Sequence, residues 1–274
     1  MKWKSFHHPD WSLPVVRRRV QEEWMDLLQD LAELLRTAGR SHLWQHTYPN
    51  LRSYHNSMSR LRKAGLIVKN TETAQLPRLE LTDLGKEYLP VYHQPEKLWN
   101  TSWNGIWYML IFDVPEAERH YRDNLRAFLK RMRMGGLQKS VWITPRDIRP
   151  EYDDLKRAAN LDAVSYLLES RTVLHHEARE IVDTSWNWEW INKLQNRYLS
   201  VYRHNLKLLE HIDHDADALL ILLKEDSEAY IQCMHLDPLL PNELLPTNYL
   251  GIDVHALHKT LRKKVAHQLQ KYIV

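Results

Sequence analysis

The sequence predicts a multidomain α+β protein with an N-terminal winged helix-turn-helix, a central ferredoxin-like α/β sandwich and a mainly helical C-terminal domain. In the first third of the chain, the predicted elements are a helix, a short helix, a third helix and two short strands, in that order. The middle alternates buried strands with amphipathic helices, and the last third repeats apolar residues with helical spacing. A chain of 274 residues is long enough for more than one core. We place the domains at residues 1–95, 96–175 and 176–274.

The N-terminal domain combines amphipathic helices with a two-stranded wing. Apolar residues spaced along one helical face predict the long first helix, and Gly39 ends it. Asn50 is a good N-cap for the third helix, and Gly65 closes that helix. The expected helices cover residues 17–36, 42–47 and 51–64, the expected strands cover 66–69 and 78–81, and a further helix covers 82–89.

The two later domains follow a linker predicted over residues 90–101. In the central domain an apolar run ending at Asp113 predicts the first strand, and Gly135 and Gly136 break the first helix. The expected central strands cover residues 106–112, 137–144 and 164–168, and the expected helices cover 117–134 and 151–160. The C-terminal domain should hold helices over 190–208, 217–234 and 254–272, with a proline-punctuated loop over 236–251.

Positive charge is concentrated around the predicted third helix. The whole chain carries a formal charge of only +3. Residues 39–70, however, contain six Lys or Arg residues and no acidic residue. Local charge decides whether a surface can meet a phosphate backbone. This stretch therefore favours nucleic acid as a partner.

The helix predicted over residues 51–64 has one apolar face and one polar face. On a helical wheel Leu51, Tyr54, Met58 and Leu61 cluster on the side that must meet the domain core. The opposite side offers cationic and amide groups, which suit the major groove of DNA. Residues near the helix N-terminus should approach bases, and later ones should touch the backbone. The candidate DNA-binding residues are Arg52, Ser53, Asn56, Arg60 and Lys63, with Arg78 in the wing. The alternative is a basic, solvated helix in a protein-interaction module.

The cellular setting follows from a few simple features. A single cysteine, Cys233, excludes an internal disulfide and indicates a reducing compartment. No apolar run reaches the length of a membrane span. The first residues are polar and lack the apolar core of a secretory signal. We expect a cytoplasmic protein with no membrane partner.

Several segments together resemble the PaaX family, repressors of phenylacetic acid catabolism. Residues 60–66 (RLRKAGL) are similar to its winged-helix element, and residues 107–115 (WYMLIFDVP) and 140–145 (SVWITP) to its central domain. Residues 237–251 (DPLLPNELLPTNYLG) resemble its proline-punctuated signature, although Tyr249 stands where Trp is usual. The resemblance implies a homodimeric repressor that binds double-stranded operator DNA and releases it on binding an acyl-CoA such as phenylacetyl-CoA.

The central domain also resembles the small ferredoxin-fold, nuclease-like subunit of CRISPR adaptation complexes. In that family an Asp at the end of the first strand, matched here by Asp113, holds a divalent metal between two protomers. This motivates an alternative function, a metal-dependent nuclease using Asp113. The simpler interpretation is that Asp113 caps the turn before Pro115.

An effector pocket is expected where the central and C-terminal domains meet, because ligand sites favour interdomain crevices. The aromatic candidates to wall an acyl group are Trp103, Trp107 and Trp142. The cationic candidates to meet a CoA phosphate are Arg146, Arg149 and Arg171. The alternative is that the tryptophans are core residues and the arginines are solvated. We predict no cofactor, no resident metal and no enzymatic activity, because the sequence lacks a Gly-rich phosphate loop, a nucleophile elbow and a catalytic carboxylate pair.

Overall fold

A computed structural model describes most of the chain from residue 94 onward and a few segments before it. The described residues are 52, 59, 62, 63, 65, 67–70, 78–82, 94–153, 165–173, 175–211, 214–269 and 271. They fall into two compact units. The first contains residues 94–193 and 234–249, and the second contains the described residues before 94, together with 194–233 and 250–271.

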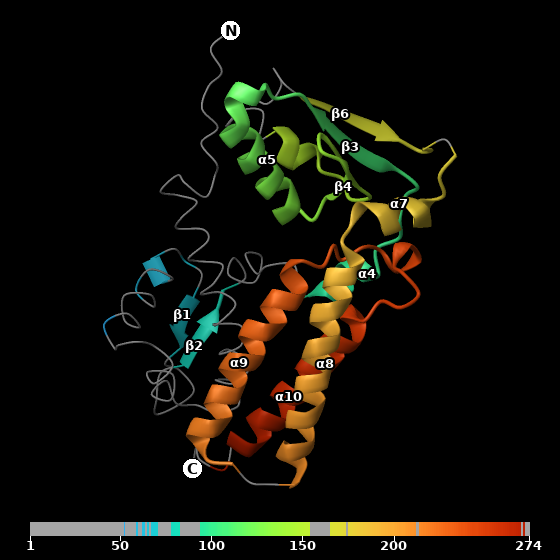
Figure 1. Ribbon diagram of the computed structural model, residues 1–274. Coiled ribbons are helices and arrows are strands. Elements are labelled where there is room, and N and C mark those ends of the chain that lie inside the picture. Colours follow the sequence, from blue (N-terminus) through green and yellow to red (C-terminus); the bar gives the residue numbers. More distant parts are fainter. Residues whose placement is uncertain are drawn as a thin grey trace. The chain divides into compact units, whose positions relative to one another are not determined.

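The first unit is built on a four-stranded antiparallel sheet (Figure 1). Its strands are β3 (Trp107–Phe112), β4 (Gly135–Gln138), β5 (Val141–Thr144) and β6 (Ser165–Ser170). They lie in the order β4-β5-β3-β6, which a β-α-β-β-α-β chain adopts in a ferredoxin-like sheet. The predicted mixed α/β class is confirmed for this part of the chain.

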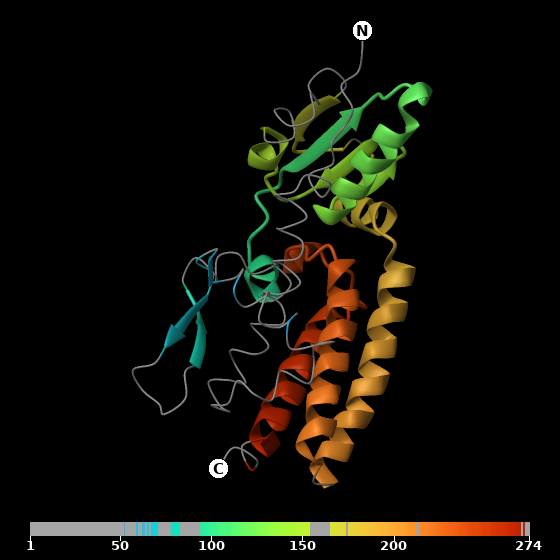
Figure 2. The same ribbon diagram turned by 90° about the vertical axis from the view of Figure 1, so that its left-hand side faces the viewer.

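Helix α5 (Arg119–Arg131) covers one face of this sheet (Figures 1 and 2). It follows a short 3-10 turn, η4 (Glu116–Glu118). Alternate residues of β3, Tyr108, Leu110 and Phe112, pack against Leu125 and Leu129 of α5, and all five are almost fully buried. The helical burial along α5 is the pattern that the sequence predicted, and the apolar run predicted as a buried strand is β3.

Three features of this unit differ from the prediction. The strand expected over 137–144 is a hairpin of β4 and β5, which turns at Lys139 and Ser140. The glycines expected to break a helix lie in β4 instead. The linker expected over 90–101 contains a short helix, α4 (Pro95–Trp99), because Pro95 fits a first helical turn and Trp99 is buried.

The remaining elements of the first unit were only partly predicted. Residues 149–153 are helical, so the first three residues of the helix expected over 151–160 are helical as predicted. The remaining residues of that expected helix lie outside the described residues. Helix α7 (Ala178–Ser185) was not predicted, although Glu177 and Glu180 form a capping box at its start. The loop before α10 contains a 3-10 turn, η6 (Asn242–Leu244).

The C-terminal helices match the prediction closely. They are α8 (Trp188–His211), α9 (Ala216–His235) and α10 (Gly251–Leu269), and the two views show them side by side (Figures 1 and 2). Each buries an apolar face, which includes Leu199, Leu223 and Leu261. The prediction of a mainly helical C-terminal region is confirmed.

A buried polar cluster links these three helices. Asp226 of α9 is fully buried. Its carboxylate accepts a hydrogen bond of 2.5 Å from Tyr198 of α8 and lies 2.7 Å from Nδ1 of His258 in α10. The His258 ring stacks on Tyr230, with ring centroids 3.9 Å apart. Burial, and then the Asp226 carboxylate, raise the pKa of Tyr198, so its hydroxyl remains a donor.

The two predicted wing strands are confirmed as an antiparallel hairpin. Strands β1 (Ile67–Asn70) and β2 (Arg78–Leu81) pair with Ile67 opposite Leu81. Gly65 precedes β1 with φ of 73°, the left-handed conformation that ends a helix, and its carbonyl accepts a hydrogen bond from the Thr82 hydroxyl. The helices expected over 17–36 and 42–47 lie outside the described residues, as does the helix expected over 82–89 apart from Thr82.

In the described part of the chain, every helix is too short or too polar to cross a bilayer.

Candidate functional site

The predicted DNA-binding residues are described only in part. Arg52 and Lys63 are helical and exposed, as are Ser59 and Arg62 of the same predicted helix. Arg78 is the first residue of β2. The predicted residues Ser53, Asn56 and Arg60 lie outside the described residues. Their assignment to DNA contacts stays a prediction.

The first unit contains a cavity of about 240 Å³. Four separate segments of the chain meet around it. They are the segment after α4, the end of α5, the turn after β5 and the start of the loop over 237–251. The lining residues are Leu98, Thr101, Ser102, Trp103, Asn104, Met132, Arg133, Thr144, Pro145, Arg146, Asp147, Pro238, Leu239, Leu240 and Pro241.

Trp103 forms a fixed aromatic wall of this cavity. Its indole N–H donates to the Ile106 carbonyl at 2.9 Å, and its ring centroid lies 5.0 Å from that of Trp107. Its backbone N–H donates to the carboxylate of Glu243 in η6. These contacts fix both the ring and the backbone of Trp103, so the wall is formed before any ligand binds.

The opposite wall, residues 238–241, is held by Asp237. This carboxylate is fully buried. It accepts hydrogen bonds of 2.8 Å from the Leu239 backbone N–H and from the Tyr249 hydroxyl. Tyr249 in turn accepts a hydrogen bond of 3.1 Å from the indole of Trp99. Burial, and then the Asp237 carboxylate, raise the pKa of Tyr249.

Arg133 lines the cavity and ties the end of α5 to two other segments of the first unit. Its guanidinium donates to the carbonyls of Met234, at 2.7 Å, and of Asp237. Its own carbonyl accepts a hydrogen bond of 3.1 Å from the indole of Trp186. Arg133 has φ of 63° in the C-cap of α5, where the Met134 N–H donates to the Leu129 carbonyl at 3.1 Å, and Leu239 has φ of 51°. Two of the three non-glycine residues with positive φ in the described chain therefore line this one cavity.

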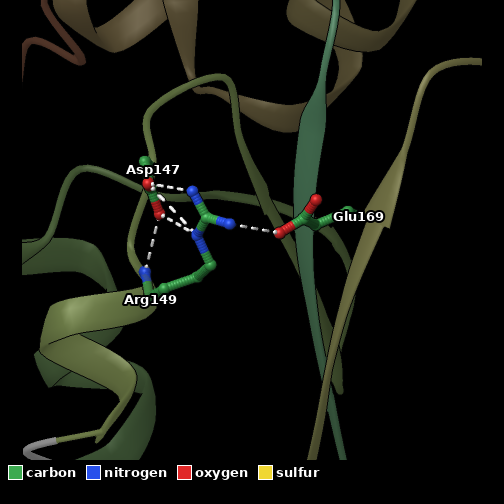
Figure 3. Close-up of polar contacts among 3 residues, drawn as sticks. All are labelled: Asp147, Arg149 and Glu169. Carbon is green, nitrogen blue, oxygen red and sulfur yellow. Dashed lines mark hydrogen bonds and ion pairs between the residues drawn. The ribbon is translucent and has the colours of Figure 1, made fainter.

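The polar end of the cavity is formed by Arg146 and Asp147. Asp147 is paired with Arg149, which donates three side-chain hydrogen bonds of 3.0, 3.2 and 2.7 Å and a backbone hydrogen bond of 3.0 Å to it (Figure 3). Arg149 also reaches Glu169 of β6 at 3.2 Å and lies over the ring of Tyr108. The hydrogen bonds from Arg149 lower the pKa of Asp147 and raise that of Arg149.

Arg146 is held less firmly than Arg149. Its Nη2 donates to the Met132 carbonyl at 3.3 Å and lies 3.8 Å from Glu151, and within the described chain these are the contacts of its guanidinium. Its side chain is about one-third exposed. The backbone N–H of Arg146 donates to the buried Thr144 hydroxyl at 3.3 Å. Arg146 therefore keeps N–H groups that can meet a ligand oxygen.

The predicted effector residues do not all lie together. Trp103 and Arg146 line the cavity. Trp107 packs on Trp103 and is buried behind it. Trp142 lies on the other face of the sheet, in the core with α5, and Arg171 is exposed just after β6. The Arg149 guanidinium forms ion pairs with the carboxylates of Asp147 and Glu169 (Figure 3).

Sequence reasoning missed Arg133 and residues 238–241 as site residues. The signal present was the prolines of the loop over 237–251, which we used only for the family resemblance. Prolines restrict the backbone, so this loop is suited to form a fixed wall. Nothing in the sequence marks Arg133, since its role depends on a left-handed backbone conformation.

The candidate metal residue Asp113 follows β3 directly and is exposed. Within the described ranges, no cluster of three or more His, Cys, Asp or Glu side chains could hold a metal ion. The histidines of the pair His255 and His258 are both buried, where His255 contacts Tyr230 and His258 contacts Asp226.

Comparisons with known proteins identify both halves of the described chain. The family model "PaaX protein central Cas2-like domain" matches residues 100–182, and the model "PaaX-like protein C-terminal domain" matches residues 186–274. A solved structure, of the uncharacterized protein Rv0674 from Mycobacterium tuberculosis, is 17% identical, with a TM-score of 0.50, over 90% of this chain and 91% of that one. At this identity the likeness concerns the fold alone. No curated protein matches the chain. Because both family domains follow one another in order, the chain belongs to the PaaX family of transcriptional regulators.

Proposed function

We propose that the protein is a homodimeric repressor that binds operator DNA through a winged helix in residues 1–95 and is released by an acyl-CoA such as phenylacetyl-CoA. Its target would be an operon for phenylacetic acid catabolism, as the family implies. The central domain, residues 96–175, and the helical domain, residues 176–274, would carry the effector response and the dimer contacts.

One observation carries the DNA-binding part of this proposal. Every described position of the predicted helix over 51–64, namely Arg52, Ser59, Arg62 and Lys63, is exposed. A helix face with this composition and no carboxylate in the surrounding stretch (residues 39–70) suits a phosphate backbone and base edges. The hairpin of β1 and β2 directly after the helix supports the winged-helix order.

The proposed release mechanism is a shift between two dimer arrangements. Dimeric helix-turn-helix proteins match half-sites one helical turn apart. An effector that binds one arrangement better than the other shifts the population toward it. We propose that acyl-CoA favours an arrangement whose reading helices no longer match the half-site spacing.

The test is selection of bound duplexes from a random pool, repeated with and without phenylacetyl-CoA. We expect tight, salt-sensitive binding to an inverted repeat that the acyl-CoA reverses. The variants Arg52→Ala and Asn56→Ala should relax sequence preference, whereas Lys63→Ala should weaken binding to all duplexes and reduce the salt slope by about one. Protein that ignores every duplex at low ionic strength would exclude the proposed function. Equal losses on specific and random DNA for all three variants would exclude the base contacts.

A further inference from the structure

We infer that the cavity between Trp103 and residues 238–241 binds a short acyl group with an aryl or small alkyl body, whose carbonyl or carboxylate oxygen meets Arg146. This inference deepens the proposed function, because it assigns the effector site and the part of the effector that the protein reads. It rests on the cavity's size, its lining and the way its walls are held.

The size of the cavity limits the ligand to a small group. Pockets that enclose drug-sized ligands measure roughly 300–1,000 Å³, and this cavity measures about 240 Å³. It can enclose a phenylacetyl-sized group but not a nucleotide. The lining residues Thr101, Ser102 and Asn104 are exposed, so this side opens to solvent and leaves room for a larger attached carrier.

The lining divides into an apolar body and a donor-rich end. The body is formed by Leu98, Trp103, Met132 and the Pro and Leu residues of 238–241. At the other end stand the Arg146 guanidinium and the hydroxyl of Thr144. Asp147, which also lines the cavity, is paired with Arg149 (Figure 3), and this pairing reduces its repulsion of an acyl oxygen there. A guanidinium beside an apolar wall is the arrangement that recognises a small amphipathic oxygen ligand.

The way the walls are held distinguishes this cavity from a packing defect. Arg133 has positive φ as the residue that ends α5, in a C-cap where the Met134 N–H donates to the Leu129 carbonyl, and Leu239 has positive φ in the loop wall. The Asp237 carboxylate, the Tyr249 hydroxyl and the Arg133 guanidinium hold them in place. A wall fixed in this way is preorganised, which lowers the entropic cost of binding.

Two sources can supply this acyl group, the free acid and its CoA thioester. The experiment uses isothermal titration of the full-length protein with phenylacetate, phenylacetyl-CoA and CoA alone. Arg146→Gln removes the proposed oxygen contact. Ser102→Trp places a bulky ring at the exposed side of the cavity without disturbing a buried position. Arg119→Gln is the matched charge control, because Arg119 is 72% exposed on α5 and does not line the cavity.

We expect phenylacetate, its thioester or both to bind the wild type and Arg119→Gln equally. Arg146→Gln should weaken this binding at least about tenfold, the effect of losing a hydrogen bond to a charged group, and Ser102→Trp should abolish it. Thermal melting of each variant checks that it is folded. If only the thioester binds, CoA is part of the recognised ligand. If phenylacetate and its thioester bind equally, the acyl group is sufficient for recognition. Either result supports the site.

Three results would overturn the inference. These are equal affinity of all variants for the ligands, binding of CoA alone as tight as that of its thioester, and no ligand binding by protein that still binds DNA. Ligand binding with the expected variant pattern by protein that ignores DNA would support the site and count against the proposed function alone.

Discussion

At the residue scale, Asp147 and Arg149 show how neighbours in sequence can cancel each other's charge. The two residues form a close pair through three side-chain hydrogen bonds and one backbone hydrogen bond, and Glu169 lies 3.2 Å from the same guanidinium (Figure 3). Arg146, on the same turn, has weaker contacts. Two arginines that are alike in sequence therefore differ in their freedom to meet a ligand.

We predict that the pKa of Asp147 lies below the usual value of about 3.9 and rises toward it in Arg149→Gln. Hydrogen bonds from Arg149 favour the ionised carboxylate and so lower its pKa. A carboxyl group whose pKa is lower in the folded state stabilises the fold at pH values above its unfolded-state pKa. This stabilisation is lost as the pH falls through the folded-state pKa. The affected window is therefore acidic, below about pH 4. Carboxyl-carbon NMR titration of both proteins measures the shift, and identical titration curves would contradict the prediction.

The buried Asp237 gives a second prediction at the residue scale. Tyr249→Phe removes the hydroxyl that donates to Asp237 and accepts from Trp99. Leaving buried polar groups without this partner should lower the free energy of unfolding by about 1–3 kcal/mol. Urea denaturation measures the loss. The control is Tyr166→Phe, because Tyr166 is 71% exposed and a surface change of this kind should stay within about 0.5 kcal/mol. Equal stability of the two variants would show that the Tyr249 hydroxyl contributes nothing.

At the element scale, the hairpin of β4 and β5 depends on close contact with α7. A Cβ on Gly135 would lie 2.6 Å from Cβ of Ser185 and 2.8 Å from the Trp186 ring. We predict that Gly135→Ala destabilises the protein by about 1–3 kcal/mol through overpacking. Gly136 is the matched control, because the nearest atoms to its added Cβ lie 4.0 Å away. Gly136→Ala should be neutral or stabilise by up to about 1 kcal/mol. Chemical denaturation compares the two variants, and a similar loss in both would exclude the proposed contact.

The elements differ in how well the sequence predicts them. The apolar periodicity of α5, α8, α9 and α10 determines which face each helix buries, so their positions could be predicted from sequence. The β4–β5 hairpin could not, because glycines usually break helices and strands, and the role of Gly135 depends on the packing of Ser185 and Trp186. Helix α4 was missed for the same reason, since five residues are too few for periodicity to appear.

The candidate site shows the same division between local and distant information. Trp103 and Arg146 could be singled out from sequence as an aromatic and a cation near the strands of the central domain. Their partners could not, because Glu243, Asp237 and Met234 reach the cavity from a part of the chain far away in sequence. Residue type and spacing carry no information about such contacts. The sequence therefore predicts the chemistry of the site better than its geometry.

At the scale of the whole molecule, the cavity is assembled from segments that two different family domains supply. Residues 98–147 and residues 238–241 both line it, and the family models divide the chain at about residue 186. The buried Asp237 and the guanidinium of Arg133 bind these segments together within one compact unit. A ligand in the cavity would contact both segments at once. Its binding would therefore stabilise the arrangement of the two segments that it contacts.

This arrangement leads to a prediction about coupling between ligand and DNA. If the ligand lowers DNA affinity by a given factor, operator DNA must lower ligand affinity by the same factor, because equilibrium coupling between two sites is reciprocal. We expect a factor on the order of 10 to 100. Titrating the ligand into free protein and into protein saturated with operator measures one side of the cycle, and DNA titrations with and without ligand measure the other. Ser102→Trp should bind DNA normally and show no coupling, because its cavity is obstructed. Equal ligand affinity with and without DNA would mean that occupation of the cavity does not regulate the protein.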